Sequence, residues 1–193
     1  MKDKLEEIYN KIYVDKTENT KSIITLIEPE IDAFMKIETS DSDCFFIATY
    51  LISEFGVSFY NQGYLKKAKP YIEKGIQNIE LDYNQKDKDV FKDELYIELI
   101  WVRGVINNNL KKYRIASRDF KSLVDHFPDN DRYKNWYKGS KNYTINLIEW
   151  VLIRIMFVCV LIGLDHKMFL FISAAAAIGL IISLIYRFIT RVK

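Results

Sequence analysis

Residues 51–82, LISEFGVSFYNQGYLKKAKPYIEKGIQNIELD, contain two helical patterns separated by a break. Gly56 lies in the first pattern, where the missing side chain permits close approach of another helix. Asn-Gln-Gly at 61–63 interrupts the helical pattern, because asparagine and glycine favour turns. An apolar stripe with helical spacing then restarts at Ala68, Ile72 and Ile76. The stretch therefore predicts two antiparallel helices joined by a short turn.

A second copy of this arrangement follows in residues 99–130, LIWVRGVINNNLKKYRIASRDFKSLVDHFPDN. When the two copies are aligned on their glycines, equivalent residues fall 48 positions apart. These equivalent pairs are Gly56 and Gly104, Ala68 and Ala116, and Ile72 and Phe120. Self-similarity at a fixed offset is typical of repeat architectures.

The helical pattern continues outside the two copies, and no alternating strand pattern is sustained between Lys4 and Phe127. Residues 1–39 are predicted to form a further helix pair, built from LEEIYNKIY and TKSIITLIEPEIDAFMKI. Pro29 is expected to kink or divide the second of these. The predicted fold class is all-α, with three stacked helix pairs, the minimum at which stacked repeats usually become stable.

The pattern over residues 40–130 resembles the tetratricopeptide repeat, in which large, small and aromatic residues recur at set places. The residues that carry the resemblance are Ile52, Phe55, Gly56, Phe59, Ala68, Ile72 and Gly75 in the first copy, and Ile100, Gly104, Ala116, Phe120, Leu123 and Pro128 in the second. Arg103 replaces the family's leucine, and Asn107 replaces its aromatic residue. The 48-residue offset also exceeds the family's usual period of about 34.

The resemblance implies a partner-binding concave surface lined by the first helix of each pair. Carried onto this sequence, it implies contacts to an unknown protein partner from both copies. The predicted contact residues are Tyr50, Ser53, Val57, Tyr60 and Asn61 in the first copy, and Glu98, Trp101, Val105, Asn108 and Asn109 in the second. A large residue such as Trp101 or Tyr60 could equally belong to the core.

The end of the chain differs in character and is predicted to span a membrane. Residues 145–164 contain only Glu149 and Arg154 as charges, residues 168–188 contain Arg187 near their end, and three polar residues separate the two runs. Each run reaches the length of about 20 apolar residues that a membrane helix needs. We expect a two-helix transmembrane hairpin, preceded by a basic and aromatic linker at 131–144. The alternative is a buried helical hairpin of a soluble protein.

Cations in the short flanks predict the orientation of such a hairpin. They favour a multi-pass protein of the inner (cell) membrane with the lipid bilayer as a partner and both termini in the cytoplasm. The flanking cations are Arg132, Lys134, Lys138 and Lys141 before the first run, and Arg187, Arg191 and Lys193 after the second.

Two features inside the predicted spans suggest contacts beyond anchoring. Arg154 lies deep in the first run, where it could reach back to the headgroups or face a neighbouring subunit or wet lumen. Ala175, Gly179 and Ser183 recur every four residues, a spacing that lets helices pack closely. This stripe would serve either the packing of the hairpin on itself or a homo-oligomer of the chain.

The sequence lacks the clusters of residues that usually indicate catalysis. The chain contains two histidines and two cysteines, widely separated, and no CxxC, HExxH or phosphate-binding glycine loop. We therefore expect no catalytic residues, no metal site and no cofactor. Residues 145–193 carry five Lys or Arg and two Asp or Glu, and the rest of the chain is nearly neutral. Neither part has the clustered cations of a nucleic-acid binder.

Two functions from different classes follow. The first is a membrane-anchored cytoplasmic adaptor that recruits a protein partner through a tetratricopeptide-like surface. The alternative is an oligomeric membrane effector, pore-forming or membrane-disrupting, with the repeats as a sensor domain and a role in antiviral defence. The abundance of lysine, isoleucine, asparagine and tyrosine is typical of an AT-rich, bacterial genome.

Overall fold

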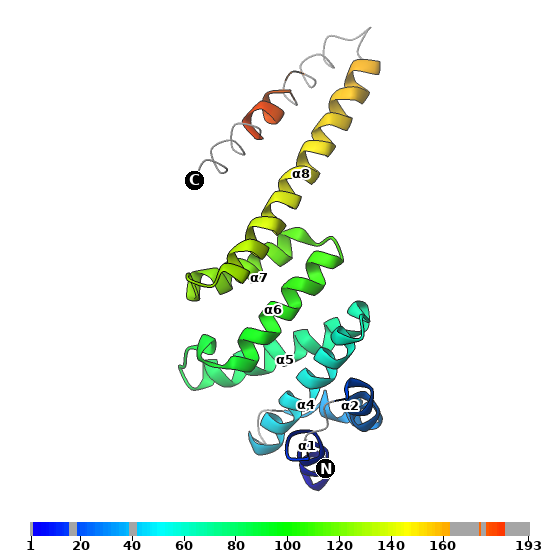
Figure 1. Cartoon of the computed structure of the whole chain (residues 1–193), viewed down its shortest axis with the longest axis vertical. Helices are drawn as coiled ribbons and strands as arrows, with labels where there is room; N and C mark the ends of the chain where they lie inside the picture. The colour runs from blue at the N-terminus through cyan, green and yellow to red at the C-terminus, as the bar shows by residue number, and fades with distance from the viewer. Residues whose placement is uncertain (1, 16–18, 39–41, 163–173, 175–176, 184–193) are drawn as a thin grey trace. The chain divides into compact units, whose positions relative to one another are not determined.

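A computed structural model describes residues 2–15, 19–38, 42–162, 174 and 177–183. The fold is all-α, as predicted, and the described residues contain no strand. The chain divides into two compact units, Met1–Tyr137 and Lys138–Lys193. Figure 1 shows the helices of the first unit following one another as packed pairs.

The first unit begins with α1 (Lys2–Tyr13), α2 (Thr20–Ile27), the 3-10 turn η1 (Glu28–Glu30) and α3 (Ile31–Phe34). Pro29 lies in η1 and divides the second predicted segment, as expected. The side chain of Asn19 accepts a hydrogen bond from the backbone N–H of Lys21 and caps α2. Both α1 and α2 pack against α4.

The first predicted copy forms α4 (Ser42–Asn61) and α5 (Leu65–Gln85). Gly63 has a positive φ of 81° in the turn between them. This left-handed conformation, which glycine adopts without steric cost, lets the Tyr64 N–H donate to the Phe59 carbonyl at 2.9 Å. The predicted Asn-Gln-Gly break is therefore a glycine-based helix end.

The second copy forms α6 (Glu94–Asn109) and α7 (Tyr113–His126), preceded by the 3-10 turn η2 (Val90–Lys92). Asp93 caps α6, because its carboxylate accepts from the N–H groups of Leu95 and Tyr96. Lys111, the equivalent of Gly63 at the 48-residue offset, also has a positive φ, here 61°. The Lys112 N–H donates to the Asn107 carbonyl at 2.7 Å, so the two turns have the same hydrogen bond.

Equivalent residues also make equivalent contacts inside the two helix pairs. A Cβ at Gly56 would lie 2.9 Å from Ile72 Cδ1, and one at Gly104 would lie 2.7 Å from Phe120 Cε1. Ala68 and Ala116 are both fully buried. The α4–α5 and α6–α7 pairs are joined by packing of α5 on α6. This arrangement is compatible with a helical repeat fold.

The last helix, α8 (Asp131–Ile162), contains the predicted linker 131–144 and most of the predicted span 145–164. The predicted second span, 168–188, lies largely outside the described residues. Within it, the structure describes residues 177–183 as helical. Within the described part of the chain, no helix is long and apolar enough to cross a membrane. The prediction of a multi-pass inner-membrane protein is therefore wrong. α8 itself begins with a polar stretch, and its later, apolar part contains Glu149 and Arg154.

Candidate binding groove

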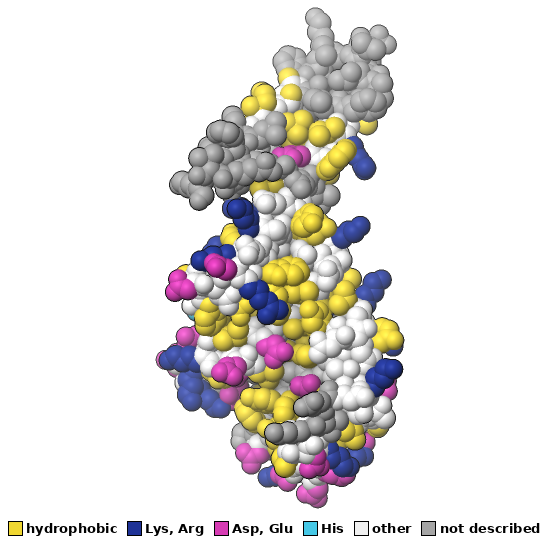
Figure 2. Space-filling model, viewed as in Figure 1, with side chains coloured by type: hydrophobic (Ala, Val, Ile, Leu, Met, Phe, Trp, Pro, Cys, Tyr) yellow, Lys and Arg dark blue, Asp and Glu magenta, His cyan; other side chains and the backbone are white. Residues whose placement is uncertain are grey.

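An open groove of about 430 Å³ lies between α4, α6 and the beginning of α8, all within the first unit. We call it the α4–α6 groove. Apolar, aromatic and charged side chains line it together: Val57, Tyr60, Asn61, Glu94, Ile97, Glu98, Trp101, Val102, Arg132 and Tyr133. In the space-filling view of Figure 2, acidic side chains lie beside hydrophobic ones on the viewed face of this unit.

Five of the ten residues predicted to contact a partner line this groove. Three come from α4 and two from α6: Val57, Tyr60, Asn61, Glu98 and Trp101. Asn61 and Glu98 are exposed, and Val57 and Tyr60 are half-buried. Trp101 is only 8% exposed and belongs to the core as well as to the groove. The two copies of the repeat thus bring their first helices to one surface.

The other five predicted residues lie elsewhere. Ser53 is fully buried and donates its hydroxyl to the Thr49 carbonyl, and Val105 is part of the core. Asn108 is half-buried and Asn109 exposed, but neither lines the groove. Tyr50 belongs to an aromatic cluster with Tyr9, Tyr13 and Phe46.

Sequence reasoning missed the contribution of α8 to the groove. Residues 131–144 were expected to form a linker, but Asn130 caps a helix by accepting from the N–H groups of Arg132 and Tyr133. The guanidinium of Arg132 then lies over the Trp101 ring, 3.9 Å from its centroid. The signal that could have found this helix is the capping asparagine that follows Pro128.

Trp101 is held in place by other aromatic rings. Its ring centroid lies 5.4 Å from Phe120, 5.6 Å from Tyr133 and 5.5 Å from Trp136. Aromatic pairs at such distances add stabilisation beyond the burial of their area. Because α6, α7 and α8 each supply a ring, this cluster fixes the side of the groove that carries Trp101 and Arg132.

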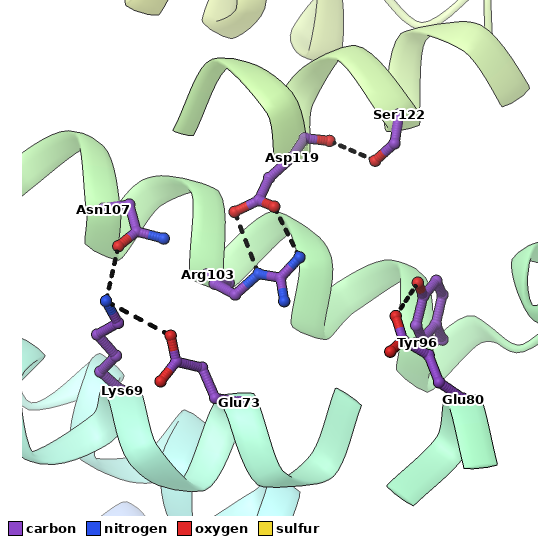
Figure 3. A network of polar contacts seen from close by, with 8 residues as sticks. All are labelled: Lys69, Glu73, Glu80, Tyr96, Arg103, Asn107, Asp119 and Ser122. Atoms are coloured by element: carbon purple, nitrogen blue, oxygen red, sulfur yellow. Dashed lines mark hydrogen bonds and ion pairs between the residues drawn. The ribbon is translucent and has the colours of Figure 1, made fainter. Parts of the chain in front are cut away.

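Polar contacts hold the face of α6 that lies opposite its groove-lining residues, and Figure 3 shows these contacts. Arg103 donates two hydrogen bonds to the Asp119 carboxylate on α7, Nη2 to Oδ1 at 2.7 Å and Nε to Oδ2 at 3.2 Å. Lys69 on α5 donates to the side chain of Asn107 at 3.1 Å. Arg103 and Asn107, the two residues that differ from the tetratricopeptide pattern, therefore bind polar side chains of neighbouring helices.

A third polar contact lies at the beginning of α6. The hydroxyl of Tyr96 donates to Glu80 Oε1 on α5 at 2.8 Å (Figure 3). Burial and the adjacent Glu80 carboxylate raise the pKa of the Tyr96 hydroxyl, so it stays protonated as the donor. Together these contacts hold α6 against α5 and α7 while the groove face of α6 stays open.

The carboxylate of Glu54 lies on the same face of α4 as Val57, one helical turn earlier. Burial raises the pKa of Glu54 above its ordinary value, and the charge of Glu98 raises it further. The Tyr13 hydroxyl donates to Glu54 Oε2 at 3.3 Å, which acts in the opposite direction. The carboxylates of Glu54 on α4 and Glu98 on α6 are therefore close enough to repel each other, and Glu98 lines the groove.

A second, smaller pocket lies between α4 and α5. Its volume of about 20 Å³ is enough for roughly one water molecule. Asn78, 2% exposed, lines it and donates to the Thr49 hydroxyl at 3.0 Å. This pocket is too small to hold a segment of another protein.

In the second unit, the predicted small-residue stripe packs within the chain. A Cβ at Gly179 would lie 3.4 Å from Leu152 Cδ1, and Ser183 donates to Glu149 Oε1 at 2.7 Å. Arg154 is exposed on α8, and Ala175 lies outside the described residues. The described positions of the stripe thus meet α8 of the same chain.

Among the described residues, no group of histidine, cysteine, aspartate and glutamate side chains is arranged to hold a metal ion. Compared with protein-family models, with curated proteins and with solved structures, the chain matches none.

Proposed function

We propose that the chain is a protein-binding scaffold, a repeat module of the tetratricopeptide type whose α4–α6 groove holds a segment of a partner protein. The observation that carries the proposal is the meeting of Val57, Tyr60, Asn61, Glu98 and Trp101 in one groove. These residues are among the ten that the resemblance to the tetratricopeptide repeat, carried onto both copies of the sequence, implies as partner contacts.

The composition of the groove supports this proposal. Protein interfaces are enriched in tyrosine, tryptophan and arginine, and the residues that dominate binding are of these types. The groove contains Tyr60, Trp101, Arg132 and Tyr133 around the apolar side chains of Val57 and Ile97. The mutual packing of the rings limits the entropy that binding would cost.

Selection of short random peptides against the immobilised full chain tests the proposal. We expect selected peptides to lose about tenfold or more in affinity on Tyr60→Ala, because that ring would contact the segment. The matched control is Tyr64→Ala, since Tyr64 is 53% exposed and lies outside the groove. Failure to select any peptide, or equal loss in both variants, would contradict the proposal.

A further inference from the structure

The charges around the α4–α6 groove are unbalanced. Glu94 and Glu98 line it from α6, and Glu54, on α4 one helical turn before the groove-lining Val57, is close enough for the charge of Glu98 to act on it. In the part of the chain that the structure describes, none of these three carboxylates forms an ion pair. Arg132 is the cation among the groove-lining residues, and it is engaged with the Trp101 ring.

Of these three carboxylates, Glu54 has the least favourable surroundings. It is half-buried, its hydrogen-bond donor is the neutral hydroxyl of Tyr13 at 3.3 Å, and the charge of Glu98 repels it. A carboxylate that loses water without gaining a cation is costly, and an incoming cation relieves both the desolvation and the repulsion.

The groove also presents aromatic faces next to these carboxylates. Arg132 stacks 3.9 Å from the centre of Trp101, so the local geometry already accommodates a guanidinium on an aromatic ring. Tyr60 and Tyr133 line the same groove, and Tyr60 comes from α4, the helix that carries Glu54. Carboxylates beside aromatic rings suit the charged head and apolar stem of lysine or arginine.

We infer that the occupant of the α4–α6 groove is a basic segment of a partner protein, whose lysine or arginine side chains pair with Glu54, Glu94 and Glu98. This inference rests on the proposed function and adds the chemical class of the partner. An acidic segment would bring like charges together at the groove, and a purely apolar one would cover the carboxylates without compensating them.

The test compares three forms of the full chain in peptide selection and in binding of the selected peptides. The groove variant is Glu54→Gln with Glu94→Gln and Glu98→Gln, which keeps side-chain shape and removes three charges. The control variant removes three charges outside the groove: Glu38→Gln, Asp87→Asn and Asp129→Asn, all exposed residues. Circular dichroism verifies that all three forms are folded.

On the unmodified chain we expect selected peptides to be richer in lysine and arginine than the starting library. Their affinity is expected to fall about tenfold in the groove variant and to stay unchanged in the control variant. A basic preference that persists in the groove variant, or that both variants lose equally, would overturn the inference. So would selected peptides without basic enrichment.

The same data separate this inference from the proposed function. If selected peptides are neutral or acidic but depend on Tyr60, the groove binds protein segments and the charge inference fails alone. If no selected peptide depends on Tyr60, the proposed function fails, and the inference fails with it.

Discussion

Arg103 on α6 and Asp119 on α7 form a bidentate ion pair that joins the two helices. Asp119 has a side chain only 5% exposed, whereas that of Arg103 is 25% exposed. Such a pair contributes modestly when complete, because both charges lose water, but removal of one partner leaves the other charge uncompensated. The pair therefore fixes the relative position of the two helices more than it adds stability.

Asp119→Leu is expected to lower the free energy of unfolding by about 3 kcal/mol, because Arg103 would be left without its carboxylate. The double variant Arg103→Leu with Asp119→Leu should recover most of that loss, since it places apolar residues at both positions. Urea denaturation followed by circular dichroism measures both values.

The control for this prediction is Asp125→Leu, which breaks an exposed ion pair with Lys121 on the same helix. It should change the free energy of unfolding by less than about 1 kcal/mol. Equal effects of Asp119→Leu and Asp125→Leu would show that the Arg103–Asp119 pair has no special structural role.

The sequence predicted that Gly56 would allow another helix to approach closely, and Ile72 of α5 lies against it. The equivalent Gly104 has the same close approach, to Phe120. Contacts that depend on charge were not predicted. Arg103 was recognised only as a departure from a leucine. Its partner, Asp119, lies on another helix, and nothing in the local pattern of either residue identifies the pairing.

The turns that end α4 and α6 are equivalent elements with different residues. Gly63 and Lys111 both have a positive φ. In each turn the N–H of the following residue donates a hydrogen bond to the carbonyl five residues before it. Glycine adopts this conformation readily, whereas a side chain at the same φ costs roughly 1 to 2 kcal/mol. The second turn therefore keeps the backbone of the first without its glycine.

Lys111→Gly is expected to raise the free energy of unfolding by about 1 kcal/mol, because it removes this backbone strain. Gly63→Ala should lower it by a similar amount for the same reason. The control is Lys112→Gly, since Lys112 has a φ of −88° and glycine there relieves no left-handed strain. Thermal and urea unfolding of the three variants measure the effects, and destabilisation by Lys111→Gly would refute the equivalence of the turns.

The helices of the repeat pairs could be predicted because turns and apolar spacing mark their ends. The bounds of the last helix could not be predicted in this way, because an apolar run does not show where a helix begins. Residues 145–164 were read as a membrane span, but α8 begins at Asp131 and includes a polar stretch. The cap at Asn130 was the better indicator of that helix, since it reports where backbone hydrogen bonding begins.

In the first unit as a whole, the groove results from the repeat, because α4 and α6 occupy equivalent positions in successive pairs. The resemblance to the tetratricopeptide repeat implied a surface lined by the first helix of each pair, and half of the groove-lining residues are among those it named. Two of the implied contact residues, Ser53 and Val105, are buried in the core instead. Arg132 and Tyr133 line the groove but could not be predicted, because they come from a helix that the repeat pattern does not include.

We propose above all that the α4–α6 groove holds a segment of a partner protein. The most direct measurement replaces Tyr60 with the photo-crosslinkable residue p-benzoylphenylalanine in the full chain and irradiates it with a selected peptide. Tyr64, exposed and outside the groove, is replaced in the same way as the control. We expect a peptide crosslink from position 60 and none from position 64. A crosslink from position 64 alone, or peptide binding with no crosslink from position 60, would contradict it.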